Sequence, residues 1–188
     1  MEERTPCSDI DFKVRLIESA DYPKLAEFTC GVPVLDRFFH HEVEECVKYH
    51  YLSAYIATTM SDEIVAVFTL MNDALMIDSQ SAKEDLIDDI RFEKAENIVD
   101  FFNRQTSYPA INIGHLGVST KYQRHKIGKA IIDLVAATYF NHTLAGCQFI
   151  TVDALNRNDT IKFYLRNSFF FQTTRDQYSS TRRMYRIL

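Results

Sequence analysis

The order strand, helix, strand over residues 111–154 constrains the fold more than any other feature of this chain. Residues 111–118 and 147–154 are each mostly apolar, as strands that are buried on both faces usually are. Between them, residues 128–140 are expected to form a helix, because apolar residues recur there at helical spacing. These residues are Ile127, Ala130, Ile131, Leu134 and Val135. Such a unit forms a right-handed crossover, so the two strands are expected to be parallel.

The rest of the chain predicts further strands and helices around this unit. Expected strands cover 12–17, 51–59, 64–70, 169–173 and 183–188. Expected helices begin near Asp21, cover 35–47, form an acidic insert within 79–107, and follow a cap at Asn158 and Asp159. The residues expected on buried faces include Phe12, Val14, Leu16, Leu25, Ala26, Phe28, Ile161, Tyr164 and Leu165. We therefore predict a single α/β domain over 1–188, with a mixed, mostly antiparallel central sheet flanked by helices.

The formal net charge of −5 conceals a division along the chain. Residues 1–110 contain 22 Asp and Glu against 10 Lys and Arg, whereas residues 111–188 contain 4 against 11. The net charge by itself argues against a general nucleic-acid binder. The excess of positive charge in the second part of the chain, however, predicts that this part faces an anion.

Cysteine and histidine spacing gives no sign of a metal site or a disulfide framework. Cys7, Cys30, Cys46 and Cys147 include no closely spaced pair, which favours free thiols in a reducing compartment. The adjacent His40 and His41 lack a closed set of ligands, so a solvated helix face is expected. The charged N-terminus is unlike a signal peptide, and the apolar stretch 64–70 is too short to span a bilayer. We expect a cytoplasmic protein with no metal and no membrane partner.

Residues 113–130 are the segment most indicative of chemistry. Here the expected strand ends, a short loop follows, and a helix begins among Arg124, Lys126 and Lys129. The first N–H groups of a helix have no partner within it, and the helix dipole favours negative charge at that end. The segment is therefore expected to bind an anion, with an ordinary basic turn as the alternative.

The same segment resembles the acetyl-CoA loop of the GNAT superfamily of N-acetyltransferases, whose pattern is Q/R-x-x-G-x-G/A. Gln123 and Gly128 match its first and last positions, whereas Lys126 stands where the family usually has glycine. A left-handed backbone at that position would cost a non-glycine residue about 1–2 kcal/mol. Asn156 and the segment 161–169 resemble a second family motif, N…A..FYEKxGF, with Ser168 in place of its glycine. The order of elements also resembles the family outside 79–107.

The resemblance implies that acetyl-CoA donates an acetyl group to an amine, which attacks the thioester directly. Strand residues Leu116, Gly117 and Val118 would pair with the pantetheine arm, and an N–H near Val118 would support the oxyanion. The pyrophosphate would lie on Gln123, Arg124, His125, Lys126, Ile127, Gly128 and Lys129, with Asn156 beside the cofactor. Tyr164 would protonate the departing thiolate, or else would be a core tyrosine. His115 and His125 are nearest in sequence to the site, but neither is identified as a general base.

The acceptor amine is left open by the sequence. Phe28 to Gly31, Leu35 to Phe39 and Pro109 to Val118 are similar to segments of a GNAT subset, the tRNA-acetylating toxins of toxin–antitoxin modules. The basic C-terminal residues would suit RNA phosphates. The acidic first part instead favours a cationic or neutral amine of a small molecule or protein, which ranks first, with aminoacyl-tRNA second. A non-catalytic GNAT-fold binding module is third, and apolar residues of the insert suggest a homodimer.

Overall fold

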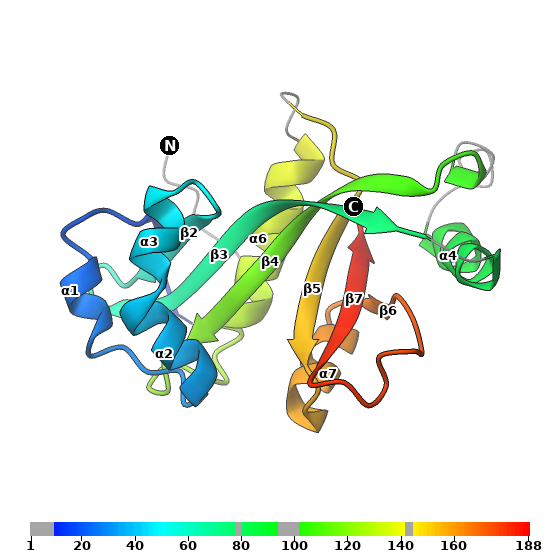
Figure 1. Cartoon of the computed structure of the whole chain (residues 1–188). Coiled ribbons are helices and arrows are strands. Elements are labelled where there is room, and N and C mark those ends of the chain that lie inside the picture. The colour runs from blue at the N-terminus through cyan, green and yellow to red at the C-terminus, as the bar shows by residue number, and fades with distance from the viewer. Residues whose placement is uncertain (1–9, 78–79, 94–101, 142–144) are drawn as a thin grey trace. The chain divides into compact units, whose positions relative to one another are not determined.

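The computed structural model describes residues 10–77, 80–93, 102–141 and 145–188 (Figure 1). Seven strands are hydrogen-bonded in the order β1-β2-β3-β4-β5-β7-β6. In chain order they are β1 (Lys13–Leu16), β2 (Ser53–Thr58), β3 (Ile64–Met76), β4 (Ser107–Val118), β5 (Phe149–Leu155), β6 (Phe170–Phe171) and β7 (Thr181–Ile187). The helices are α1 (Tyr22–Leu25), α2 (Pro33–His41), α3 (Val43–Lys48), α4 (Gln80–Glu93), α6 (Ile127–Asn141) and α7 (Asn158–Leu165).

The sheet is mixed, as the sequence predicted. The pairs β1–β2, β2–β3, β5–β7 and β6–β7 are antiparallel. The pair β4–β5 is parallel, with Ala110 opposite Phe149 and Asn112 opposite Thr151. The parallel pair expected from the crossover pattern is therefore confirmed.

The chain packs as two compact units. The first contains residues 1–71 and 113–137, and the second contains 72–112 and 138–188. The elements β3, β4 and α6 contribute residues to each unit. The prediction of a single domain over 1–188 stays a prediction.

In the first unit, α1, α2 and α3 supply apolar side chains to a core shared with β2 and β3. Its most buried members are Leu25, Phe39, Val43, Ala54 and Val67. The rings of Phe28 and Phe39 meet edge to face at 5.7 Å, which is a favourable geometry for aromatic pairs. The β2–β3 hairpin turns through Asp62, whose φ is 64°.

Three expectations about this unit are wrong in detail. Leu16 is exposed, because β1 ends there and the alternation stops; Ile17 is buried instead, and its N–H donates to Ala54 O at 3.0 Å. Ala26 is exposed because α1 ends at Leu25. The expected helix 35–47 is two helices, since Glu42, at φ −119°, separates α2 from α3.

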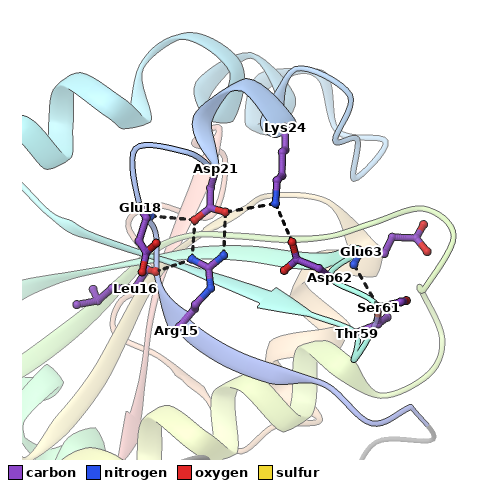
Figure 2. Close-up of polar contacts among 9 residues, drawn as sticks. All are labelled: Arg15, Leu16, Glu18, Asp21, Lys24, Thr59, Ser61, Asp62 and Glu63. Atoms are coloured by element: carbon purple, nitrogen blue, oxygen red, sulfur yellow. Dashed lines mark hydrogen bonds and ion pairs between the residues drawn. The ribbon is translucent and has the colours of Figure 1, made fainter.

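A polar network fixes the entry to α1 (Figure 2). Asp21 is 2% exposed and accepts two hydrogen bonds from Arg15, at 2.6 and 2.8 Å. The Glu18 N–H also donates to Asp21, at 2.9 Å. Lys24 extends the network to the hairpin turn, where it contacts Asp62 at 2.8 Å. The hydrogen bond and ion pair with Arg15 hold the pKa of Asp21 below its usual range, against the desolvation that burial causes.

In the second unit, α4 packs on the sheet through a cluster of aromatic and aliphatic side chains. Leu86 and Ile90, four residues apart on α4, are buried together with Tyr108, Phe149 and Tyr185. This confirms a helical segment in the insert from 80 to 93, while 94–101 lie outside the described residues.

Three expectations about the second unit also need correction. The strand expected to begin at Ile111 begins at Ser107 and includes Pro109, whose carbonyl accepts a hydrogen bond from Gln148 N at 2.8 Å. Proline has no backbone N–H to donate to a neighbouring strand, but its carbonyl can still accept a hydrogen bond, as it does here. The N-cap of α7 is Arg157 and has no side-chain cap, so Asn158 and Asp159 do not cap it. Leu165 is exposed near the C-terminus of α7.

No helix in the described part of the chain is long and apolar enough to cross a membrane. Cys30, Cys46 and Cys147 are free thiols, as expected, while Cys7 lies outside the described residues.

Candidate functional site

The loop between β4 and α6, residues 119–126, is anchored to other parts of the first unit. The Ser119 N–H donates to Val65 O at 2.9 Å, and the Thr120 N–H donates to Thr29 O at 3.0 Å. These bonds tie the loop to β3 and to the turn before α2. The start of α6 is therefore held in a fixed position relative to the end of β4.

Gln123 reinforces this anchoring. Its side-chain amide donates to Cys30 O at 2.8 Å and to Val118 O at 3.1 Å. Both contacts are to backbone carbonyls of the first unit, so the side-chain nitrogen holds the loop. If Gln123 has the expected role in cofactor binding, it acts through its backbone groups and by holding the loop in shape.

The loop contains two residues in the left-handed backbone region. Arg124 has φ 68° and Lys126 has φ 60°. Lys126 stands where the family motif has glycine. Its backbone is left-handed, a conformation that glycine adopts easily and that costs lysine free energy. Lys126 O then accepts the Ala130 N–H at 2.9 Å, which begins the hydrogen-bonding of α6. Lys126 therefore adopts the left-handed backbone conformation that is usually occupied by glycine.

Positive side chains surround this turn. Arg124, His125, Lys126 and Lys129 are all exposed. Lys129 forms an ion pair with Asp133 one turn further along α6. By contrast, Ile127 and Gly128 are buried and offer the turn only their backbone groups. Exposed cations and the first N–H groups of a 15-residue helix can bind a phosphate or pyrophosphate.

The end of β4 is tightly packed at Gly117. A Cβ at this position would lie 2.7 Å from Phe39 Cε2 and 3.2 Å from Cys30 Cβ. Glycine is therefore needed so that β4 can approach α2. Leu116 and Val118, on either side, are half-buried.

His115 is a half-buried residue of the first unit. Its ring stacks on Phe38, with centroids 3.5 Å apart and planes 4° from parallel. Thr69 Oγ1 accepts the His115 backbone N–H at 3.0 Å and lies 3.1 Å from its Nδ1. Burial lowers the pKa of His115 to about 4, so the imidazole is neutral near pH 7 and accepts a proton only weakly. Nothing in the sequence predicts that Thr69 contacts His115.

Tyr164 lies near the end of α7 in the second unit. Its side chain is 8% exposed, and its ring meets those of Phe163 and Phe169, each at 5.1 Å. Burial raises the pKa of the Tyr164 phenol, so the group stays protonated at neutral pH. A protonated phenol can donate a proton, and the aromatic contacts fix the position of the ring.

The helix carrying Tyr164 ends in a Schellman-type turn at Ser168. The Phe169 N–H donates to Tyr164 O at 3.2 Å and the Ser168 N–H donates to Leu165 O at 3.3 Å. Ser168 has φ 62°. Serine thus adopts the left-handed conformation of the glycine that it replaces in the family motif.

Asn156 follows β5 and supports a neighbouring loop. Its side-chain nitrogen donates to Gln177 O at 3.0 Å and to Ser179 O at 2.8 Å. The expected location of Asn156 beside the cofactor stays a prediction. The contacts show that its amide N–H groups are used within the second unit.

A further polar cluster of the second unit was not predicted from the sequence. Asp73 of β3 accepts hydrogen bonds from Thr151 and from Arg183, and Asn112 donates to Thr151 Oγ1 at 3.2 Å. Desolvation raises the pKa of Asp73, but these contacts outweigh it and the net pKa is lowered. Four strands supply these residues, and their separation along the chain leaves no local motif.

No group of three or more potential metal ligands occurs among the residues for which the structure gives a placement. His40, one of the two histidines considered in the sequence, places Nε2 2.7 Å from Phe28 O.

No protein-family model matches the chain, and no curated protein matches it in sequence. Solved structures do match. A crystal structure described as a bacterial toxin aligns with TM-score 0.71 and 17% identity, covering 94% of this chain and 90% of the other. A tyrosine-to-phenylalanine mutant of KacT aligns with TM-score 0.69 and 14% identity, covering 94% of each chain. The chain has the GNAT fold.

AtaT, solved with acetyl-methionyl-tRNAfMet, has the same fold, with TM-score 0.67 and 16% identity, covering 92% of this chain and 94% of AtaT. The GNAT fold predicted from the two motifs is therefore confirmed over nearly the whole chain. At these identities the likeness establishes the fold, and the activity requires a separate argument.

Proposed function

We propose that this protein is an acetyl-CoA-dependent N-acetyltransferase whose acceptor is the α-amino group of an aminoacyl-tRNA. The observation that carries the proposal is the structural match to AtaT over 92–94% of both chains, because AtaT has been solved with acetyl-CoA and with acetyl-methionyl-tRNAfMet. This reverses the ranking that the charge distribution suggested, in which an amine of a small molecule or protein came first.

Residues of the first unit fit the acetyl-CoA part of the proposal. The turn at 123–129 offers exposed cations and the N–H groups at the start of α6, which suit a pyrophosphate. Leu116, Gly117 and Val118 of β4 would bind the pantetheine arm through their backbone groups, and a Val118 N–H would support the oxyanion. Acetyl-CoA, when bound, supplies the acetyl thioester.

The chemistry needs a neutral amine and a proton for the departing sulfur. The amine nitrogen forms a bond to the acetyl carbon, the carbon–sulfur bond breaks, and the thiolate takes a proton. Tyr164 is the proposed proton donor, since burial keeps its phenol protonated. The positively charged product nitrogen releases its extra proton to water, and the Tyr164 phenolate takes a proton back from water.

The weakness of His115 as a base favours an α-amino acceptor. A free α-amino group, with a pKa of about 7.8, is neutral in roughly one molecule of seven at pH 7. A lysine amine, with a pKa of about 10.4, is neutral in fewer than one in a thousand. An α-amino group therefore needs far less help from a base, and His115 is shielded, neutral and held by Thr69.

The test is transfer of radiolabel from acetyl-CoA to charged tRNA. We expect label in aminoacyl-tRNA and none in the same tRNA after removal of its amino acid. Polyamines and lysine peptides, offered in parallel, test the acceptor that ranked first from the sequence. Label in those amines but not in charged tRNA would reject the tRNA acceptor. Absence of acetyl-CoA binding in calorimetry at millimolar ligand would reject the enzyme altogether and leave a binding module.

Tyr164→Phe tests the proton donor. This change removes only the hydroxyl and retains the ring contacts with Phe163 and Phe169. We expect kcat to fall by about 10²–10⁴-fold, the usual contribution of a general acid, with acetyl-CoA affinity unchanged. Leu165→Ala, at an exposed position of the same helix, is the control. Unchanged turnover in Tyr164→Phe would remove the assignment.

A further inference from the structure

Residues 172–180 connect β6 to β7 and form a loop that is anchored by hydrogen bonds along its length (Figure 1). At its start, the Gln172 N–H donates to Arg183 O at 3.0 Å and the Gln172 side chain donates to Met76 O at 2.8 Å. In its middle, Asp176 accepts from Arg182 Nε at 2.7 Å and from the Arg183 N–H at 2.6 Å. At its end, Ser180 O accepts the Asn156 N–H at 2.9 Å. The loop is thus held at both ends and in between.

These contacts support the tip of the loop on either side of Tyr178. The Asn156 side chain donates to the carbonyls of Gln177 and Ser179, the two neighbours of Tyr178. Tyr178 itself is 93% exposed, the highest value among the large apolar or aromatic side chains described. The loop therefore presents an exposed aromatic side chain from an anchored stretch of backbone.

The surroundings of Tyr178 in the sequence are polar and positively charged. Gln177, Ser179 and Ser180 flank it in the sequence, and all three are exposed polar residues. Residues 155–188 contain seven Lys and Arg against two acidic residues. Arg182 and Arg183 form ion pairs with aspartates. Lys162 of α7 and Arg166, which follows that helix, are exposed.

We propose that Tyr178 stacks on an unpaired base of the RNA acceptor. This inference rests on the proposed function, in which the acceptor is an aminoacyl-tRNA. Proteins that bind single-stranded RNA combine cations for the phosphates with aromatic rings on which bases stack. Because the backbone on both sides of Tyr178 is already anchored, stacking of a base need not order the loop, which reduces the entropic cost of binding. Asn156 acts as a positioning residue for this contact.

The test is the affinity of the full-length protein for uncharged tRNA without acetyl-CoA, measured by fluorescence anisotropy. Tyr178→Ala is expected to weaken binding roughly 5- to 150-fold, the range for loss of one stacked base. Tyr178→Phe retains the ring and should bind within about threefold of the original protein. Tyr49→Ala, which removes a tyrosine that is 68% exposed in the other unit, is the matched control and should bind as the original protein does.

The salt dependence separates stacking from charge. Tyr178→Ala should leave the slope of log affinity against log salt unchanged, whereas Arg175→Ala should reduce it if that side chain contacts a phosphate. Because Tyr178 is exposed, Tyr178→Ala should unfold at the same temperature as the original protein.

Equal tRNA affinity in Tyr178→Ala and the original protein would overturn the stacking proposal, as would loss of a protein partner with tRNA affinity intact. No measurable tRNA binding by the original protein would also overturn it. Weakened binding in Tyr178→Ala, together with no acetyl transfer to charged tRNA by the original protein, would support the stacking surface and reject the proposed function. The two failures are therefore distinguishable.

Discussion

Replacing Ser168 with glycine should stabilise the protein. Ser168 has φ 62°, a conformation that costs a residue with a Cβ about 1–2 kcal/mol. Glycine removes this strain but adds about 0.5–1 kcal/mol of chain entropy to the unfolded state. The serine side chain is exposed, so no buried contact is lost. The net gain should be about 0.5–1 kcal/mol, or about 1–4 °C in Tm for a chain of this size.

Ser168→Ala is the matched control, because it removes the hydroxyl and retains the Cβ. We expect urea and thermal unfolding to place Ser168→Gly above both the original protein and Ser168→Ala. The hydrogen bonds from Phe169 to Tyr164 and from Ser168 to Leu165 involve only backbone atoms, so each variant can keep them. If Ser168→Gly is no more stable than Ser168→Ala, then strain at this turn is negligible and the reasoning is refuted.

Three further changes test other features. Lys126→Gly should raise the unfolding free energy by up to about 1 kcal/mol, because it relieves the same backbone strain. It should also weaken acetyl-CoA binding in calorimetry, because the lysine amine is lost. Lys126→Ala should weaken binding without the gain in stability. Gly117→Ala should destabilise by about 1–3 kcal/mol in urea unfolding, because the new Cβ would overlap Phe39, and the same change should cost less in a variant that already has a smaller residue in place of Phe39. Because the pKa of Asp21 is lowered in the folded state, its stabilising effect is complete above the unfolded pKa of about 3.9 and is lost as pH falls further. Asp21→Asn should therefore lower the urea midpoint more at pH 7 than at pH 3, and an equal loss at both pH values would contradict this.

The regular elements were predictable where periodic apolar residues cover several turns. The apolar spacing over 127–135 predicts α6, and four of the five residues that define it are buried while Leu134 is half-buried. The parallel pairing of β4 with β5 follows from the crossover pattern and is present. Exposure at element ends was not predictable from spacing. Leu165 continues the pattern of its helix but lies where α7 ends, outside the core.

The candidate site was predictable in its outline but not in its contacts. The sequence identified the turn around Lys126 through its charges and its resemblance to a known loop. It did not show that the Gln123 side chain bonds to Cys30 O, because the two residues are 93 positions apart. Likewise, Asn156 reaches carbonyls more than twenty residues away. Side-chain contacts over such separations depend on tertiary structure and leave no local pattern.

The left-handed turn at Lys126 has a consequence for how proteins of this kind can diverge. The Gln123 amide, through Cys30 O and Val118 O, helps to hold the loop that leads into this turn. With that support, the glycine of the turn can be replaced at a moderate loss of stability while the amide groups keep their direction. A chain can therefore keep the shape of this turn although its sequence departs from the motif at the glycine position. If the turn binds acetyl-CoA as proposed, the Lys126 side chain is also a position at which charge can alter that affinity.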